Sequence, residues 1–236
     1  IPKGIHSNLL MQMVQKEERF CQVLSFILAA KSLKCHPFRI EDNLFLARGS
    51  LNGKVISDRA ALSRLEETIT KGFIPIVPGS FSHLCDGGPV YLGCKGADYS
   101  AVVLAEALNQ AQCYLCSGKR GLYSSNLPGI TISETLDRIS YAECLEMAAA
   151  GMEVPSARAV ERAENTAIHV CVCGPDAQEE GTWIMSETNE KSVIIKAVAL
   201  DKETAKVAVL GVPDRPGIAA RLFSGLAHEG ICVEMI

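Results

Sequence analysis

The sequence has neither an excess of basic residues nor a long hydrophobic run. Its 23 lysine and arginine residues are outnumbered by 27 aspartate and glutamate residues, which leaves a net charge of −4 and a pI near 5.8. Because nucleic-acid-binding domains usually carry a basic stripe, this balance argues against a nucleic-acid partner. The apolar run at residues 23–30 is far shorter than the roughly 18 residues that a membrane-spanning helix needs. We therefore expect a cytoplasmic protein whose partners include neither a nucleic acid nor a membrane.

The chain also lacks an initiator methionine, a signal peptide and any metal-ligand spacing among its five histidines. A start at Ile1 without these features is typical of a truncated chain, so we expect a fragment. Its 236 residues, of which 48% are hydrophobic and 21% charged, are enough for one large globular domain, or for one domain and part of another.

Ten cysteines lie mostly inside apolar runs, where a reduced thiol behaves as a small buried hydrophobe. Cys113 and Cys116 have the spacing of a redox pair or of half a zinc site. However, they lie in a strand-like run, in which positions three apart face opposite ways. Cys171 and Cys173 would share a face, but they offer at most two ligands at a non-standard spacing. Core packing is therefore favoured over metal binding, and we assign no metal site.

Helical and strand-like segments alternate along most of the chain. Asp58 is well placed to cap the second helix, and the apolar run 73–79 is typical of a strand buried on both faces. This alternation predicts an α/β sandwich around a largely parallel sheet. The expected helices span residues 8–33, 58–72, 97–111, 140–150 and 157–164, and the expected extended segments span residues 37–40, 73–79, 113–117, 167–173 and 182–185.

Glycine-containing loops follow several of these strands. Gly79, residues 93–96 and residues 118–121 each come after a strand, and Asp98 lies near the start of a helix. Ligands of α/β proteins bind in loops at the carboxyl ends of strands, where glycine lets backbone N–H groups approach phosphate oxygens. Composition alone does not separate such a phosphate site from ordinary turns.

The end of the chain reads as a second unit, with a domain boundary near residues 188–192. A strand at 206–210 is followed by the turn 211–217 (GVPDRPG), a helix to residue 228 and a strand at 231–236. Backbone N–H groups at the start of such a helix can hold the carboxylate of a small amino acid. The unit resembles the start of an ACT domain, the module that senses amino acids in biosynthetic enzymes, and it stops before that module is complete.

The order of motifs along the whole chain resembles the aspartokinase branch of the amino-acid kinase family. Residues 93–101 (GCKGADYSA) are similar to its G-R-G-G-S-D-Y-S/T-A signature, and residues 74–79 (IPIVPG) stand where the family has I-P-V-V-T-G. Three further segments match in the right order: Glu18-Arg19 to the E-R of G-E-R-x-S, residues 139–143 to L-S-Y-x-E, and residues 151–160 to G-A-K-V-L-H-P-R-A/T-V. Residues 198–202 match the entry into the first ACT domain.

This resemblance implies a three-layer αβα amino-acid-kinase fold over residues 1–188, without its N-terminal part, followed by an incomplete ferredoxin-like ACT domain over residues 192–236. The family's lysine-bearing loop would lie upstream of Ile1. The implied activity is the ATP- and Mg²⁺-dependent phosphorylation of L-aspartate to 4-phospho-L-aspartate, which leads to lysine, threonine and methionine. Feedback by lysine or threonine and a homodimer formed through ACT domains are implied as well.

The resemblance also implies the site residues. Glu18 would hold the substrate amine, and Asp98 would orient the substrate region. The residues implied for the substrate are Glu18, Cys94, Lys95, Gly96, Ala97 and Asp98; for the nucleotide Ser117, Gly118, Gly121, Tyr123, Ser124 and Arg158; and for the effector Asp214, Arg215, Pro216 and Gly217. Four of these residues have an ordinary alternative: Glu18 as a solvated helix charge, Asp98 as a helix cap, and Asp214 and Arg215 as turn residues.

Several positions depart from the family pattern. The substrate-gripping arginine falls on Cys94 and its neighbouring serine on Ala97, and a thiol cannot make a bidentate contact to a carboxylate. Two loop carboxylates are replaced by Gly118 and Arg120, and a nucleotide-contacting lysine is replaced by Glu153. Phosphoryl transfer depends on the positioning of the reactants and on the stabilisation of developing charge, so these changes affect residues that would take part in the transfer.

Two alternatives follow from these departures. The chain could belong to a regulatory or dimerising subunit that binds an amino acid but transfers no phosphate. It could also belong to a kinase for a different small carboxylate, although losses on the nucleotide side argue against that reading, since any substrate would still need ATP. Binding of a nucleotide separates the enzymes from the regulatory subunit.

Overall fold

The structure is a computed structural model that describes residues 7–42, 44–47, 55–84, 87–127, 134–175, 181–186, 195–200, 208–213, 215 and 217–229. Its helices are α1 (Ser7–Ala30), α2 (Arg59–Thr70), α3 (Gly96–Ala107), α4 (Tyr141–Ala149), α5 (Ala157–Thr166) and α6 (Ile218–His228), with a 3-10 turn, η1 (Ile40–Asp42). Its strands are β1 (Cys35–Pro37), β2 (Leu46–Ala47), β3 (Val55–Ile56), β4 (Ile74–Ile76), β5 (Phe81–Leu84), β6 (Pro89–Tyr91), β7 (Gln112–Cys116), β8 (Arg138–Ser140), β9 (His169–Cys173) and β10 (Thr182–Met185).

The strands form three sheets. One sheet has the order β7-β9-β10-β8, another the order β3-β2-β5-β6, and β1 pairs with β4. Within the first sheet β7 and β9 are parallel, β9 and β10 antiparallel, and β10 and β8 parallel. The predicted α/β class is confirmed. Most pairings are parallel, as expected, with antiparallel pairs such as β5 and β6 among them, but the described strands form three sheets rather than one.

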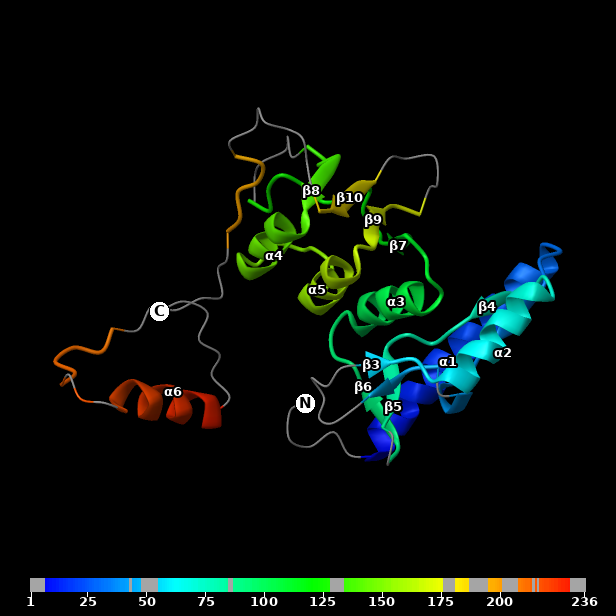
Figure 1. The fold of residues 1–236 in the computed structure, drawn as a ribbon, viewed down its shortest axis with the longest axis horizontal. Coiled ribbons are helices and arrows are strands. Elements are labelled where there is room, and N and C mark those ends of the chain that lie inside the picture. Colours follow the sequence, from blue (N-terminus) through cyan, green and yellow to red (C-terminus); the bar gives the residue numbers. More distant parts are fainter. Residues whose placement is uncertain are drawn as a thin grey trace.

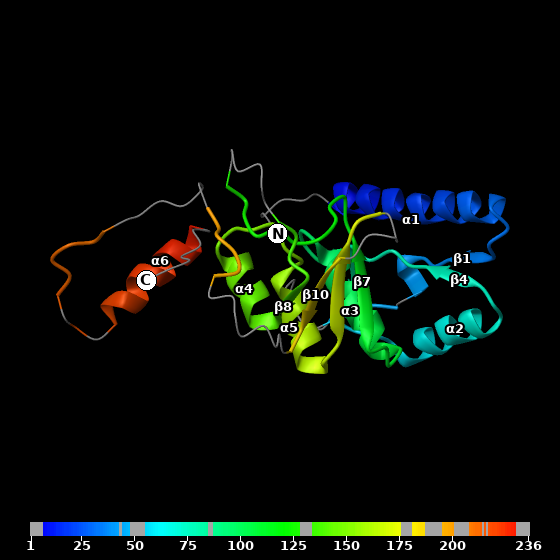
Figure 2. The ribbon, with the colours of Figure 1, turned by 90° about the horizontal axis from the view of Figure 1, so that it is seen from above.

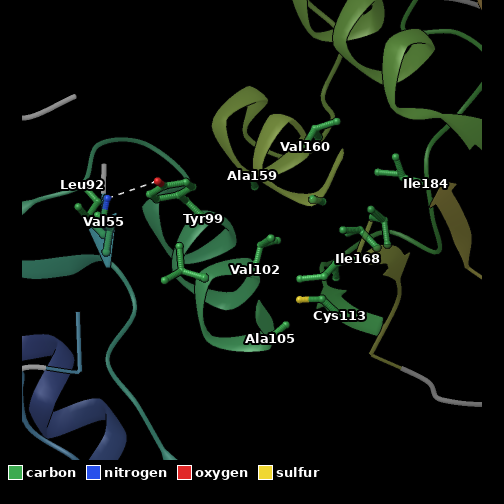
Figure 3. Close-up of a cluster of buried hydrophobic side chains, with 14 of the residues drawn as sticks. Val55, Leu92, Tyr99, Val102, Ala105, Cys113, Ala159, Val160, Ile168 and Ile184 are labelled. Atoms are coloured by element: carbon green, nitrogen blue, oxygen red, sulfur yellow. Dashed lines mark hydrogen bonds between the residues drawn. The ribbon is translucent and has the colours of Figure 1, made fainter. Parts of the chain in front are cut away.

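Helices α3, α4 and α5 lie in a row along the β7-β9-β10-β8 sheet (Figures 1 and 2). Their apolar side chains form the main core, and α3 contributes to it on two sides. Figure 3 shows Tyr99 facing Val55 of β3, while Val102 lies on the side of the helix towards Cys113 of β7. Val102 is completely buried. The tight packing of both sides holds the N-terminus of α3 in place.

Local sequence signals set the starts of several helices. Asp58 accepts hydrogen bonds from the N–H groups of Ala60 and Ala61 at 3.0 Å each, which confirms the predicted cap of α2. Ser140 and Glu143 form a reciprocal capping box at the start of α4. Ser156 accepts a hydrogen bond from the N–H of Ala159 and caps α5. These caps satisfy N–H groups that a helix leaves without an internal partner.

The region around β4 differs from the sequence expectation. Residues 73–79 were expected to form one strand buried on both faces, but β4 has three residues and pairs, among the described residues, with β1 alone. Ile74 is therefore 45% exposed. Pro78 lies beyond the end of the strand, and Pro75 lies within it, where it cannot donate a ladder hydrogen bond. The expected extended segment 37–40 lies earlier, at Cys35–Pro37, and η1 begins at Ile40.

The end of the chain stands apart from the main core. Helix α6 confirms the helix predicted after Gly217, but it buries none of its residues among the described part of the chain (Figure 1). Residues 208–210 form no strand, which contradicts that part of the expected strand 206–210, and residues 231–236 lie outside the described residues. Among the described helices, none has the length and apolar character to cross a membrane.

Candidate active site

The N-terminus of α3 is the centre of the candidate site. The backbone enters the helix through Gly93, with a φ of 93°, and through Lys95 in the left-handed region, with a φ of 57°. A Cβ on Gly96 would lie 2.7 Å from the Cβ of Leu92, so this position requires glycine. Cys94, Lys95 and Ala97 are exposed around this turn. Exposed backbone groups at a helix N-terminus favour an anionic ligand.

The loop after β4 packs directly against this helix. The Ser100 hydroxyl donates a hydrogen bond of 2.6 Å to the carbonyl of Gly79. A Cβ on Gly79 would lie 3.3 Å from the Cα of Ala97, so glycine permits this close approach. The structure thus brings together two of the glycine loops that the sequence singled out.

Glu17 of α1 completes this part of the site, and the sequence analysis did not select it. Its Oε1 accepts hydrogen bonds from the N–H groups of Gly79 and Ser80 at 3.1 and 3.0 Å. Its Oε2 is buried and has no hydrogen-bond partner among the described residues. The sequence shows two adjacent carboxylates, Glu17 and Glu18. Only the packing of α1 against the loop at residues 79–80 shows that Glu17 is the one that contacts this loop.

Glu18 has different neighbours. Its Oε1 accepts a hydrogen bond of 3.0 Å from the N–H of Ile40, and it lies 3.9 Å from the guanidinium of Arg39. Its side chain is only 13% exposed. The solvated-charge alternative therefore does not describe Glu18. Its contacts run to the start of η1 rather than to α3.

Asp98 lies in the first turn of α3 and links it to α5. Its Oδ2 accepts a hydrogen bond of 3.1 Å from the N–H of Ser156, the residue that caps α5. Burial raises the pKa of Asp98, and the hydrogen bond from Ser156 and the nearby Lys95 oppose that rise. A carboxylate whose pKa is raised by its surroundings is a candidate functional group.

Residues 153–154 receive contacts from both the α3 turn and the loop after β7. The Lys95 ammonium donates a hydrogen bond to the carbonyl of Val154. The Lys119 ammonium forms an ion pair with the carboxylate of Glu153. This contact lowers the pKa of Glu153, chiefly through the hydrogen bond from Lys119. The negative charge at position 153 is thus matched by a cation from the opposite loop.

Arg158 is held against α3. Its guanidinium lies 4.3 Å from the centre of the Tyr99 ring and donates a hydrogen bond of 3.4 Å to the carbonyl of Leu92. Tyr99 in turn accepts a hydrogen bond from the N–H of Val55. The described contacts of Arg158 therefore support the loop that leads into α3.

The predicted nucleotide residues fall into two groups. Ser117 and Gly118 are exposed at the end of β7, where the Ser117 hydroxyl accepts a hydrogen bond from the N–H of Lys119. Tyr123 and Ser124 lie further on, where Tyr123 forms a bridge with Thr135 and the Ser124 N–H donates to the carbonyl of Glu134. Only the first group lies at the loop that reaches Glu153.

Gly121 separates these two groups. A Cβ there would lie 2.6 Å from the Thr182 Oγ1, so the position requires glycine for packing. The Thr182 hydroxyl also accepts a hydrogen bond of 2.8 Å from the N–H of Leu122. Gly121 therefore packs against Thr182 of β10 and is not part of the exposed loop at residues 117–119.

Two of the predicted effector residues, Arg215 and Gly217, lie at the start of α6. Arg215 is exposed, and Gly217 has a φ of 90° and precedes the helix. Asp214 and Pro216 lie outside the described residues. The expected turn before a helix is present, and the role of these residues as an effector site stays a prediction.

Comparison with known proteins places the chain in a family. A profile described as the amino acid kinase family matches residues 13–174, well over half of the chain. Among curated proteins, the chain is 33% identical over 174 residues to the aspartokinase of Thermus thermophilus and 35% identical over 178 residues to that of Helicobacter pylori. These matches cover 74% and 73% of this chain, but 43% and 44% of the two relatives. The chain thus spans less than half of their length.

Solved structures show the same fold. Aspartokinase III of E. coli in complex with aspartate and ADP superposes with a TM-score of 0.70 at 24% identity, over 89% of this chain and 48% of that one. Aspartate kinase from Synechocystis superposes with a TM-score of 0.64 at 25% identity, over 93% of this chain and 37% of that one. The chain therefore belongs to the amino acid kinase family and has the α/β fold of the aspartokinases.

Proposed function

We propose that this chain is part of an aspartokinase, which transfers the γ-phosphoryl group of ATP to the side-chain carboxylate of L-aspartate and forms 4-phospho-L-aspartate. The observation that supports this most is that the Gly79 loop packs on the start of α3, while Lys95 of the 93–98 turn and Lys119 of the 117–119 loop both reach residues 153–154. The relatives named aspartokinase, and the E. coli complex with aspartate and ADP, indicate the ligands that such a site takes.

The residues divide the work between substrate and nucleotide. Aspartate would lie at the α3 turn beside residues 94–98, with Asp98 orienting its surroundings. The family resemblance assigns its ammonium group to Glu18, whose described contacts run to Ile40 and Arg39. The polyphosphate of ATP would lie between the N-terminus of α3 and residues 117–119. Lys95 and Lys119 supply positive charge there, and backbone N–H groups aimed at developing charge stabilise a phosphoryl-transfer transition state.

Magnesium is implied by the family, and the described residues do not form a set of protein ligands for it. The loop after β7 has glycine at 118 and arginine at 120, and the carboxylate that faces it, Glu153, is paired with Lys119. Magnesium usually takes several oxygen ligands from phosphates, water and one or two carboxylates. The proposed transfer therefore includes no step on a metal held by the described residues of this chain.

The second unit is proposed to regulate the first. Residues 192–236 would form the start of an ACT domain that binds lysine or threonine through residues 214–217. This domain would pair with the same domain of a second copy of the chain. It would control a step towards lysine, threonine and methionine. E. coli aspartokinase III has been solved with lysine and aspartate, which supports this choice of effector. Residues 195–200 contact the first unit, since Leu200 accepts a hydrogen bond from the Asn126 amide and donates one back to it. The boundary near 188–192 remains a proposal.

A regulatory subunit without phosphoryl transfer is the second candidate, and Glu17 favours it. Its carboxylate already takes up the N–H groups of Gly79 and Ser80, which an anionic ligand could otherwise use. Cys94 and Ala97 add to this reading, since neither side chain can grip a carboxylate as arginine does. A kinase for a different small carboxylate would explain Cys94 and Ala97 but not the altered nucleotide loop.

One experiment separates these candidates. The whole protein is incubated with ATP, magnesium and L-aspartate, and aspartyl phosphate is trapped with hydroxylamine. We expect hydroxamate above the no-enzyme control, and a loss of at least tenfold in Asp98→Asn, because the variant keeps the shape but not the charge. If no product forms and ADP does not bind, while lysine or threonine still binds in calorimetry, the regulatory reading replaces the kinase. If the same assay gives hydroxamate with another dicarboxylate but not with L-aspartate, the protein is a kinase for a different substrate.

A further inference from the structure

Cys116 and Cys173 lie side by side at the ends of β7 and β9. The two strands are parallel, and these two residues are direct partners in their register. Their sulfur atoms are 3.7 Å apart. Cys116 is exposed, and Cys173 is half-buried. The pair differs from the Cys113–Cys116 spacing in the sequence, because Cys113 points into the core.

The two thiols differ in their surroundings. Burial, with the neighbouring thiols of Cys116 and Cys171, raises the pKa of Cys173 to about 11. Cys171 is buried on the same strand, and burial likewise raises its pKa. The exposed thiol of Cys116 is therefore the one that a small oxidant in solution can reach first.

We propose that Cys116 and Cys173 form a reversible modification site for hydroperoxides. The Cys116 sulfur attacks one peroxide oxygen, the O–O bond breaks, and a sulfenic acid and water (or an alcohol) result. The Cys173 sulfur then attacks the Cys116 sulfur, the S–O bond breaks, and water leaves with the Cys173 proton. The product is one disulfide, formed by the loss of two electrons and two protons from the pair. Two molecules of a thiol such as glutathione return both residues to the reduced state by exchange, and they leave as the oxidised disulfide of that thiol.

The geometry needs only a small movement. The sulfurs have to close from 3.7 Å to the roughly 2.0 Å of a disulfide. Both residues stand at the ends of their strands, where fewer ladder hydrogen bonds hold the backbone. Because β7 and β9 already pair with Cys116 opposite Cys173, the two thiols can meet without any rearrangement of the sheet.

The site lies at the base of the loop that follows β7. The Ser117 N–H donates a hydrogen bond of 2.8 Å to the carbonyl of Cys173, and Gly174 packs against the backbone of Arg120. A disulfide between Cys116 and Cys173 would therefore link the residue before Ser117 to the residue before Gly174. Because this loop is the proposed nucleotide loop, any effect on nucleotide binding rests on the proposed function, whereas formation of the bond does not.

The test uses the whole protein, first reduced and then treated with hydrogen peroxide. Remaining thiols are alkylated, and the protein is digested and mapped by mass spectrometry without reduction. We expect a linked peptide pair that contains Cys116 and Cys173 and that disappears after treatment with glutathione. Cys173→Ser should accumulate sulfenic acid at Cys116, which dimedone traps. Cys171→Ser is the matched control, and it should still form the bond.

Two outcomes would overturn the inference. One is alkylation of Cys116 and Cys173 in full after peroxide treatment, and the other is oxidation of Cys116 to sulfinic acid while Cys173 stays reduced. Mapping of the unmutated protein decides between these results even if a variant fails to fold. Absence of kinase activity would leave the outcome unaffected, so the inference and the proposed function fail separately.

Discussion

Single residues in this site take their roles from their neighbours in space. Glu17 and Glu18 are adjacent in sequence, but Glu17 holds the Gly79–Ser80 loop and Glu18 holds the start of η1. Adjacent positions on a helix do not face the same way, so the two carboxylates cannot serve one ligand identically. Likewise, Glu153 stands where the family has a lysine, so the sequence indicates a reversed charge. In the structure this carboxylate is paired with the ammonium group of Lys119. The consequence of a residue change therefore depends on its partner.

Gly121 and Gly118 provide a test at this scale. A methyl group at Gly121 would collide with Thr182, whereas a Cβ at Gly118 meets nothing within 4 Å. We expect Gly121→Ala to lower the free energy of unfolding by about 1–3 kcal/mol, the usual cost of overpacking. Gly118→Ala, three residues earlier in the chain, should change it by less than about 0.5 kcal/mol. Urea unfolding measures both, and equal stability of the two variants would contradict this packing.

Asp98 provides a test of pH dependence. Burial raises its pKa in the folded chain, so the ionised form is disfavoured by folding. Its contribution is fully favourable below the ordinary aspartate pKa of about 3.9, and it is lost as the pH rises through the higher folded value. Asp98→Asn cannot ionise. It should therefore gain stability relative to the unmutated chain between pH 4 and neutrality.

Thermal unfolding of both proteins across this pH range is the measurement. The midpoint difference should grow with pH and level off above the folded pKa. A constant difference at every pH would show that Asp98 is not perturbed in this way.

At the scale of elements, helix starts are the best-defined features of the chain. Asp58, Ser140 and Ser156 each accept a backbone hydrogen bond at a helix start. Such caps act locally, so the sequence can specify them without knowledge of the rest of the fold. Strands are less well defined by the sequence. β4 is shorter and more exposed than its apolar run indicates, because the burial of a strand depends on the strands beside it.

The capping box of α4 allows a quantitative test. Ser140→Ala removes the acceptor of the Glu143 N–H, and we expect a loss of about 1 kcal/mol in the free energy of unfolding. Ser63→Ala is the matched control, because Ser63 lies exposed within α2 and, among the described residues, its hydroxyl donates to the carbonyl of Arg59 in its own helix. Chemical unfolding should show a lower midpoint for Ser140→Ala alone. A similar change in both variants would mean that the box contributes nothing specific.

At the scale of the molecule, burial is uneven. The packed region lies around α3, α4, α5 and the β7-β9-β10-β8 sheet, whereas α6 buries no residue among the described part (Figure 2). Helix α1 packs on β1 with one side and exposes Phe20 and Phe26 on another, at 67% and 76%. Stability should therefore differ strongly along the chain, since local opening follows local burial.

Hydrogen exchange tests this unevenness. In the chain of these 236 residues, amides of α6 should exchange at least tenfold faster than those of α3, because α3 is packed on two sides. The comparison is internal, so one sample provides both the test and its control. Equal protection of the two helices would contradict the exposure of α6.

The sequence by itself determined the family, the alternation of helices and strands, and the glycine loops around the start of α3. These features depend on local patterns, such as caps, periodic apolar residues and glycines that permit close backbone approach. Tertiary structure alone decided which carboxylate meets which loop, which cation meets Glu153, and which thiol lies beside Cys116. Residues 17 and 79, 119 and 153, and 116 and 173 are far apart in sequence, and only the packing of α1 and the order of the strands bring them together.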